Sequence, residues 1–155
     1  MAKFGKISQS RLDTCHQDIQ NVMGDVIAAL PWTDSISKIT IHDCSILCGV
    51  RTEEEQDLAY KRETSLVQWP DSRHNVIPPE TKSDAVDAAP YHSEKPHIHW
   101  DDINEMEAFS RLVLAMAHKR MIGMRWGGDW NQNGIRVDKD PKEKLLDGPH
   151  YELID

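Results

Sequence analysis

No apolar run in the 155-residue sequence approaches the length that a membrane-spanning helix needs, and no segment is repeated. The first residues, MAKFGKIS, lack the apolar core of a secretory signal. We therefore expect no membrane insertion, and we expect the protein to be made and folded in the cytoplasm.

Cysteine and positive charge are also scarce. The three cysteines, Cys15, Cys44 and Cys48, are an odd number, which argues against a disulfide framework and favours a reducing compartment. With 26 acidic and 18 basic residues the formal net charge is −8, which repels phosphate backbones. We therefore expect no nucleic-acid partner.

The sequence does contain enough apolar residues for one core, since hydrophobic residues make up 39% of the chain. Apolar periodicity and a capping box predict three helices, at 10–30, 52–63 and 101–123. Their expected N-caps are Ser10, Thr52 and Asp101. Strands are expected within 37–50 and in AVDAAPY, MRWGGDW and PHYELI. This order favours an α+β fold with a small antiparallel sheet, in a single domain that spans residues 1–155.

Residues 67–100 differ from the rest of the chain. Five of the eight prolines fall here, and only AVDAAPY has a strand-like pattern. A connection of this length is unusual in a compact domain, so we interpret it as a functional loop.

Two groups of histidines are candidate metal ligands. His97 and His99, in HIHWDD, lie on one face of an extended segment and are spaced to chelate one ion. The alternative is that they belong to a polar edge strand that leads into the next helix.

The second group is His74, Asp87 and His150, with Asp147 beside them. Asp87 interrupts an apolar strand, and a buried carboxylate needs a cation or hydrogen-bond donors. Two histidines and one carboxylate are a zinc ligand set that leaves a fourth position open. Asp147, three residues before His150, suits a general base. Spacing alone does not show that these residues converge.

Five motifs in this order resemble a known family: FGKIS, CGVRTEEEQ, SRH followed by SDAVDAAPY, WGGDW and DGPHYEL. Together they resemble the zinc-dependent phage endolysins of the L-alanyl-D-glutamate peptidase type, which are relatives of the D-alanyl-D-alanine carboxypeptidases. The resemblance covers nearly the whole chain. It implies a compact fold of the D-alanyl-D-alanine carboxypeptidase and hedgehog-like type, without a separate wall-binding domain.

The resemblance also implies roles for individual residues. Zn²⁺ would be held by His74, Asp87 and His150, with Asp147 as the catalytic base and Arg51 facing the substrate. The tentative substrate-binding residues are Gln56, from the family match, and Trp126 and Asp129, from a WGGDW segment that is expected to line the cleft beside Trp130.

The sequence departs from the family between the first two ligands. NVIPPETK lengthens this run, and Ser83 stands where the family has glycine. Asp84 could compete with Asp87, but residues three apart on a strand face opposite ways, and AAPY follows Asp87 as it does in the family.

The expected function is hydrolysis of the L-alanyl-D-glutamate amide in the peptide stem of peptidoglycan, by a monomer. The expected enzyme waits in the host cytoplasm and reaches the periplasmic wall of a Gram-negative host through a holin-type pore. Three alternatives remain open: a D-alanyl-D-alanine carboxypeptidase, a non-catalytic zinc-stabilised wall-binding module, and a metal-dependent phosphodiesterase that uses His97 and His99.

Overall fold

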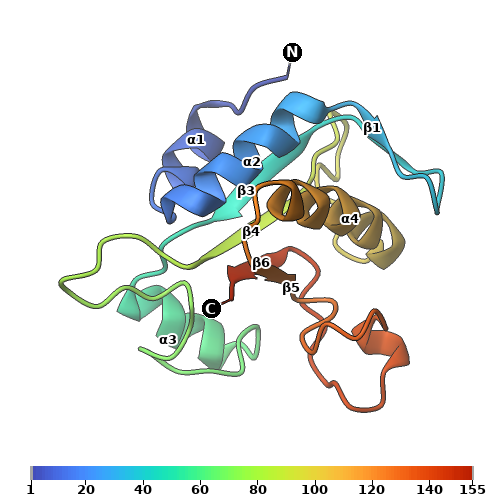
Figure 1. The fold of residues 1–155 in the computed structure, drawn as a ribbon. Helices are drawn as coiled ribbons and strands as arrows, with labels where there is room; N and C mark the ends of the chain where they lie inside the picture. The colour runs from blue at the N-terminus through green and yellow to red at the C-terminus, as the bar shows by residue number, and fades with distance from the viewer. Residues whose placement is uncertain (1, 155) are drawn as a thin grey trace.

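The computed structural model describes residues 2–154. Its elements follow one another in the order α1 (Lys6–Leu12), α2 (Gln17–Ala29), β1 (Trp32–Thr33), β2 (Thr40–Ile41), β3 (Cys44–Cys48), α3 (Glu53–Lys61), β4 (Ala85–Pro90), α4 (Ile103–Lys119), β5 (Met124–Trp126), the 3₁₀ turn η1 (Val137–Lys139) and β6 (His150–Leu153). The expected α+β class is confirmed (Figure 1). Within the described residues, no helix is both long enough and apolar enough to cross a membrane.

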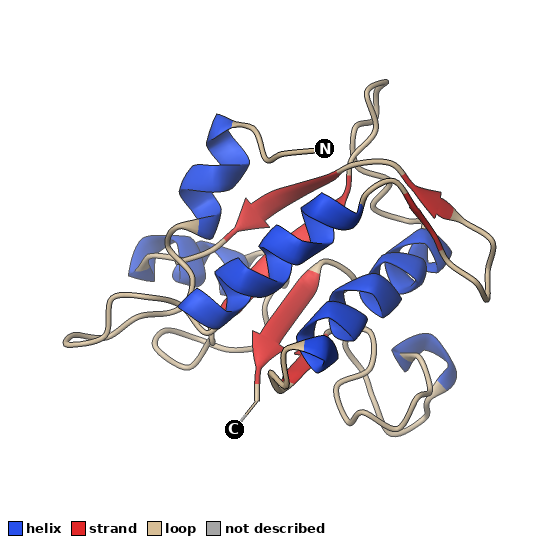
Figure 2. Ribbon diagram, turned by 45° about the horizontal axis from the view of Figure 1, so that its top comes forward, coloured by secondary structure: helices blue, strands red, loops and turns tan. Residues whose placement is uncertain are grey.

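The main sheet has four antiparallel strands in the order β3-β4-β6-β5, and β1 and β2 form a separate pair. Helices α2 and α4 lie side by side over one face of this sheet (Figure 2). Helix α3 lies apart from them, on the side of the C-terminus (Figure 1). One face of the sheet is therefore covered by helices, and the other is available for a site.

Side-chain alternation along β6 separates the core from the site. Tyr151 is fully buried, and its ring packs edge-on against Phe109 of α4 at a centroid distance of 6.2 Å. Successive residues of a strand face opposite sides, so His150 and Glu152 project from the face away from α4. The same rule sends Met124 and Trp126 of β5 toward α4 and Arg125 away from it.

The expected single helix over 10–30 is wrong, because the chain forms two helices there. Ser10 is an internal residue of α1, and α2 begins at Gln17 with His16 as its N-cap, whose Nδ1 accepts from the backbone N–H of Asp18. Between the helices, Cys15 forms a parallel bridge with Ser83. The apolar periodicity continues across this break, so periodicity alone predicts one helix where there are two.

The other two helices agree better with expectation. Thr52 caps α3 as expected, since its hydroxyl accepts from the backbone N–H of Glu55 at 3.2 Å. Helix α4 is capped by Asp102 rather than Asp101, and it ends at Lys119. The expected strands at 85–90, 124–126 and 150–153 are all present, although the WGGDW segment leaves the sheet after Trp126.

Candidate functional site

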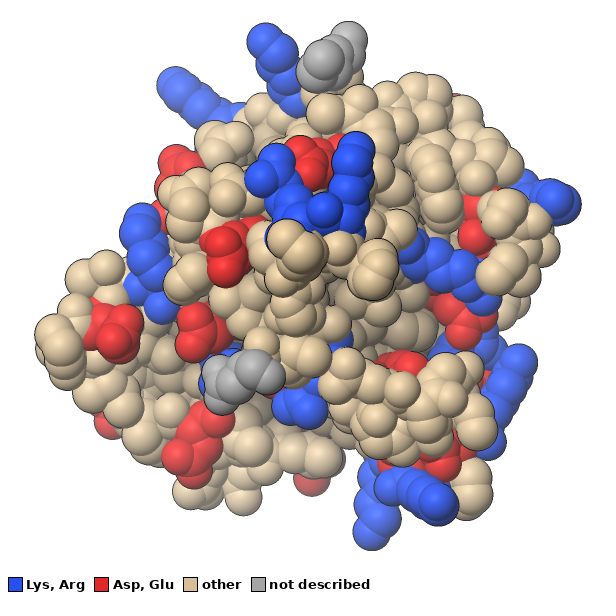
Figure 3. Space-filling model, viewed as in Figure 1, with Lys and Arg blue, Asp and Glu red and all other residues tan. Residues whose placement is uncertain are grey.

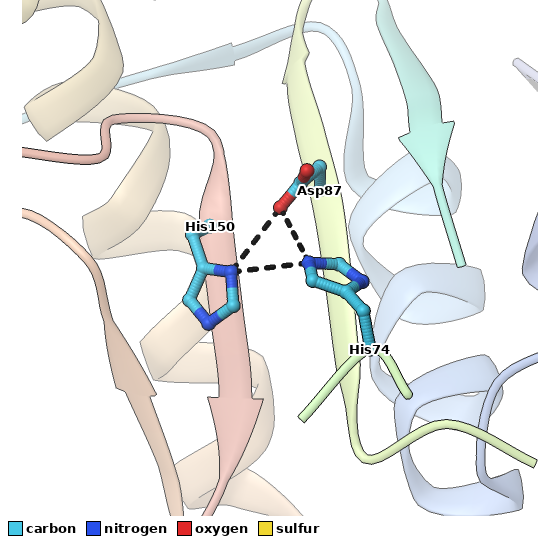
Figure 4. A group of neighbouring side chains, drawn as sticks. All are labelled: His74, Asp87 and His150. Carbon is cyan, nitrogen blue, oxygen red and sulfur yellow. Dashed lines mark hydrogen bonds and ion pairs between the residues drawn. The ribbon is translucent and has the colours of Figure 1, made fainter. Parts of the chain in front are cut away.

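His74, Asp87 and His150 converge on the face of the sheet opposite α4 (Figure 4). His74 Nε2 lies 3.0 Å from Asp87 Oδ1 and 3.2 Å from His150 Nδ1, and His150 Nδ1 lies 3.3 Å from Asp87 Oδ1. Asp87 and His150 are direct partners across the antiparallel pair β4–β6, whereas His74 comes from the loop before β4. Pairing of the two strands thus places two of the three groups.

Each histidine is held by a second partner that fixes its ring. His74 Nδ1 lies 2.7 Å from the carbonyl oxygen of Gly49, and a carbonyl can only accept, so this nitrogen carries the proton. His150 Nε2 donates in the same way to Glu152 Oε1 at 2.8 Å. The lone pairs of His74 Nε2 and His150 Nδ1 are therefore directed toward Asp87. This arrangement of outer partners is typical of histidines that bind metals.

The charges of the three groups are strongly coupled. Burial alone would lower the pKa of His74, but the adjacent Asp87 carboxylate outweighs it and raises that pKa to about 10. Burial alone would raise the pKa of Asp87, yet the two imidazoles hold it well below its usual range. Burial likewise opposes protonation of His150, but hydrogen bonds to Asp87 and Glu152 raise its pKa. The charged form of Asp87 is therefore stabilised by the two imidazoles, and a metal ion between the three groups would take the place of their shared protons.

The donor set and its spacing fit zinc. A tetrahedral zinc ion bonded at about 2.0–2.1 Å keeps its ligand atoms about 3.3 Å apart. The three observed separations, 3.0, 3.2 and 3.3 Å, are close to that edge length. A fourth position would remain for a water molecule or a carbonyl oxygen.

Asp147 lies beside the three groups without joining them. Its Oδ2 is 4.0 Å from His150 Nδ1, and 31% of its side chain is exposed. Burial, and secondarily the negative charge of Asp87, raises the pKa of the Asp147 carboxyl to about 6. Its backbone N–H donates to the carbonyl of Gly127, where a Cβ would lie only 2.3 Å from the Asp147 carbonyl oxygen. Glycine at 127 is what allows this close approach.

Arg51 reaches the same site from the other side. Its Nη2 lies 3.6 Å from Asp87 Oδ2, and its Nη1 donates to Gln56 Oε1 at 3.0 Å. Gln56 itself is fully buried, and its amide nitrogen donates to Ser65 and to the carbonyl of Val67. Gln56 thus orients Arg51 and anchors the segment after α3, and it is not on the cleft surface.

These residues open onto a cleft of about 480 Å³. Its lining includes His74, His150, Asp147 and Glu152, three arginines (Arg51, Arg73 and Arg125), the segment 64–67 and Trp130. Arg125 is paired with Glu152 at 2.9 Å and Arg73 donates to the carbonyl of Leu153, so Arg51 is the guanidinium that faces the three groups. On the face of the molecule that Figure 3 shows, basic and acidic side chains are otherwise interspersed.

Of the three residues of the WGGDW segment that were considered for the cleft, only Trp130 lines it. Trp126 is 4% exposed, and its indole N–H donates to the carbonyl of Gly148, so it belongs to the core rather than to the cleft lining. Asp129 lies outside the lining as well. Trp130 does line the cleft, and its ring lies 5.1 Å from that of His150.

The departures from the family pattern leave the three groups in place. Asp84 faces another hollow, beside His16 and Arg73, and does not approach His74 or His150. Ser83 is buried at the bridge to Cys15, and its hydroxyl donates to the carbonyl of Ala85. The lengthened run at 75–82 is largely exposed.

His97 and His99, one of the two candidate ligand groups, do not form a chelating pair. The ring of His97 stacks on Tyr91, and its Nδ1–H donates to the carbonyl of His92 at 2.9 Å. His99 instead stacks against His92. The segment is a turn rather than a strand, so the two side chains do not share a face, and the phosphodiesterase hypothesis loses its site.

Residues 129–140 carry a further pattern of metal-ligand type. Asp129, Asn131, Asn133, Gly134 and Asp140 have the spacing of an EF-hand calcium loop, with aspartate where the last position usually has glutamate. Their side chains lie together, since the amides of Asn131 and Asn133 both donate to Asp140 Oδ2 and Asp129 accepts from two backbone N–H groups. These oxygens could hold a hard divalent cation.

Comparisons with known proteins agree with the fold and the motifs. Residues 1–154 match the model of a family described as phage L-alanyl-D-glutamate peptidase. The L-alanyl-D-glutamate peptidase of Escherichia phage T5 is 28% identical over 152 residues, which cover 98% of both chains. The crystal structure of the L-Ala D-Glu endopeptidase ChiX of Serratia marcescens matches with a TM-score of 0.66 and 21% identity, over 97% of this chain and 89% of that one. The expected fold type is thereby confirmed.

Proposed function

Because the chain belongs to the phage L-alanyl-D-glutamate peptidase family, we propose that it hydrolyses the L-alanyl-D-glutamate amide of peptidoglycan stems with a zinc ion held by His74, Asp87 and His150. The observation that carries the zinc assignment is the convergence of three ligand atoms whose two imidazoles are each oriented by an outer acceptor. A structural zinc site would need a fourth protein ligand, and the three-residue group has none among the described residues.

When bound at such a site, zinc lowers the pKa of a water molecule and polarises the carbonyl of the scissile amide. Asp147 would accept the proton of the attacking water and pass it to the leaving amine. Its position supports this role, since it borders the cleft, lies 4.0 Å from a proposed ligand and is held by its own backbone hydrogen bond to Gly127. The carboxylate is thus close to the reaction without being needed as a ligand.

Arg51 would bind a carboxylate of the stem or the oxygen of the scissile carbonyl. Its planar group is suited to two parallel hydrogen bonds, and Gln56 holds it beside Asp87. We propose Gln56 as a positioning residue and Trp130 as the flat wall of the cleft. Trp126 and Asp129 have no direct role in this proposal.

All residues of the proposed site belong to one chain, so we propose that a monomer is active. In keeping with the phage family, we also propose that the enzyme remains in the host cytoplasm until a holin-type pore admits it to the wall. Expression in the cytoplasm alone should leave cells intact, and co-expression with a pore-forming protein should lyse them. Lysis without the pore would contradict this route.

Mass spectrometry of digested peptidoglycan tests the reaction. Purified wall material incubated with the zinc-loaded protein should yield stems with a new free amine on D-glutamate. Release of terminal D-alanine would establish the carboxypeptidase alternative instead. Wall binding without any new fragment would establish the non-catalytic module.

A further inference from the structure

A second cluster of metal-ligating side chains lies away from the proposed zinc site. It consists of His92, His99 and Glu105, one ligand atom of each lying within 4.8 Å of the others, and it shares no residue with the His74 group. His92 follows the end of β4, His99 lies in the turn before α4, and Glu105 is in the first turn of α4. We call these three residues the His92 cluster.

Glu105 is the feature of this cluster that calls for a ligand. It is only 6% exposed, and its Oε1 accepts from His92 Nε2 at 2.7 Å. Its Oε2 is buried and has no hydrogen-bond partner, because His99 Nδ1 is 3.6 Å away, which is too far for a hydrogen bond. A buried carboxylate oxygen without a partner is costly, and a cation that contacts it removes that cost.

Two further contacts fix the imidazoles near this oxygen. The rings of His92 and His99 are stacked, with centroids 3.8 Å apart and planes inclined by 13°. His92 and His97 close the intervening turn through two hydrogen bonds, from the His92 N–H to the His97 carbonyl and from the His97 ring to the His92 carbonyl. His97 is therefore a support of the cluster and not a member of it.

Glu105 and the two imidazoles together make a ligand set for one divalent ion. One divalent ion beside Oε2 would meet ligand atoms of His92 and His99, which lie within 4.8 Å of the carboxylate and of each other. Two imidazoles and one carboxylate suit zinc and similar transition metals better than calcium or magnesium. About a third of each imidazole is exposed, which would give the ion access to solvent and an open coordination position.

We propose that His92, His99 and Glu105 form a second site for a zinc-class divalent ion, which fastens the turn at 91–102 to the start of α4. This turn carries the histidine-rich segment that the peptidase function leaves unexplained. The His92 cluster is also next in sequence to a residue that packs against the loop carrying Asp147. Met106, next to Glu105, packs against Gly148, where an added Cβ would lie 3.2 Å from the Met106 side chain.

Equilibrium dialysis of the full chain against Zn²⁺ alone tests this site. The metal-free wild type should bind two zinc ions, and the double variant His92→Gln, His99→Gln should bind one. His118→Gln is the matched control, since it alters an exposed histidine of α4 that belongs to neither metal-ligating group, and it should still bind two. His150→Ala should lose the other ion, which separates this site from the proposed catalytic one.

Glu105→Gln tests the site even if the double variant does not fold. It keeps the volume and a hydrogen-bonding oxygen of the side chain but removes the charge. We expect it to weaken the second binding event by more than about tenfold while melting cooperatively. One zinc ion per wild-type chain that His150→Ala removes, two per double variant, or unchanged affinity in Glu105→Gln would each overturn the second site.

Discussion

Asp147 Oδ2 lies 4.0 Å from His150 Nδ1, whereas Asp87 Oδ1 lies 3.3 Å from the same nitrogen. Two carboxylates therefore flank Nδ1 of His150 at different distances, and they come from different elements. Asp87 belongs to β4 and is fixed by the sheet, while Asp147 stands on the loop that leads into β6. The difference supports a ligand role for Asp87 and a proton-transfer role for Asp147.

Asp147→Asn separates these two roles. The amide keeps the size of the side chain but cannot accept a proton, so the rate of stem hydrolysis should fall by about 10²–10⁴. The zinc content should stay at the wild-type value, because the carboxylate is not among the three converging groups. Hydrolysis rates and metal content measured on the same sample provide the comparison. Loss of zinc together with activity would make Asp147 a ligand, and wild-type activity would exclude it as the base.

His74→Ala and His150→Ala should each lose the zinc ion of the proposed catalytic site and all measurable hydrolysis. Removing one of three ligands leaves a buried carboxylate and a single imidazole, which bind zinc poorly. Metal analysis after dialysis is the measurement. His118→Ala changes an exposed histidine of α4 and should leave both quantities unaltered. Full zinc occupancy in either ligand variant would refute the assignment.

Zinc removal should also lower the melting temperature of the wild type. An ion that binds only the folded state stabilises it by about 2.7 kcal/mol when its free concentration is a hundred times the dissociation constant. Melting curves with and without a chelator, followed by zinc addition, measure the effect. An unchanged Tm would mean that the three groups hold no ion under those conditions.

Arg51→Lys tests the planar guanidinium. Lysine keeps the positive charge but cannot form two parallel hydrogen bonds, so the variant should fold and bind zinc yet hydrolyse stems at least about tenfold more slowly. Arg62→Lys, at the exposed end of α3, is the matched control and should behave as the wild type. Near-normal turnover in Arg51→Lys would remove this residue from the reaction.

A stability prediction concerns Asp34, which is 1% exposed and accepts from Arg111 at 2.6 Å and from Ser37. Asp34→Asn should reduce the free energy of unfolding by about 1–3 kcal/mol, because it leaves buried donors poorly satisfied. Asp25→Asn breaks an exposed pair with Arg120 and should cost about 0–1 kcal/mol. Urea unfolding of both variants compares them, and equal costs would show that burial is not decisive here.

The pH dependence of the Asp34 effect has a definite sign. Burial raises the pKa of Asp34, but hydrogen bonds from Ser37 and the charge of Arg111 outweigh it and lower that pKa below its usual value. A carboxyl with a lowered pKa in the folded state stabilises the fold above its unfolded pKa, and this contribution is lost as the pH falls through the folded pKa. The difference between wild type and Asp34→Asn should therefore shrink below about pH 4. A difference that grows on acidification would contradict this.

The strands of the main sheet and two of the three expected helices could be predicted from the sequence because their signals are local. Alternation marks β4 and β6, and Thr52 with Glu55 marks the start of α3. The break between α1 and α2 could not be predicted, since it depends on the pairing of Cys15 with Ser83, 68 positions away. The apolar periodicity of residues 10–30 gives no information about a bridge partner so far along the chain.

For the candidate site, too, the residue types could be predicted from the sequence and their arrangement in space could not. His74, Asp87, Asp147 and His150 could be named from motifs, but their convergence depends on the register of β4 and β6. Gln56 was expected near substrate, yet it is buried behind Arg51, because helix position alone does not reveal what covers a polar side chain. The His92 cluster could not be foreseen either, since Glu105 meets His92 only when the turn folds back on α4.

The register of β6 has a consequence for how errors in folding would affect activity. Tyr151 faces α4, while His150 and Glu152 face the cleft, so a slip of one residue would turn every one of these side chains to the opposite side. A tyrosine would then stand in the cleft, and two ionisable groups would enter the apolar core. A misregistered chain would therefore lack both a stable interior and a ligand set. Correct packing of Tyr151 in the core and correct placement of His150 in the cleft thus depend on the same strand register.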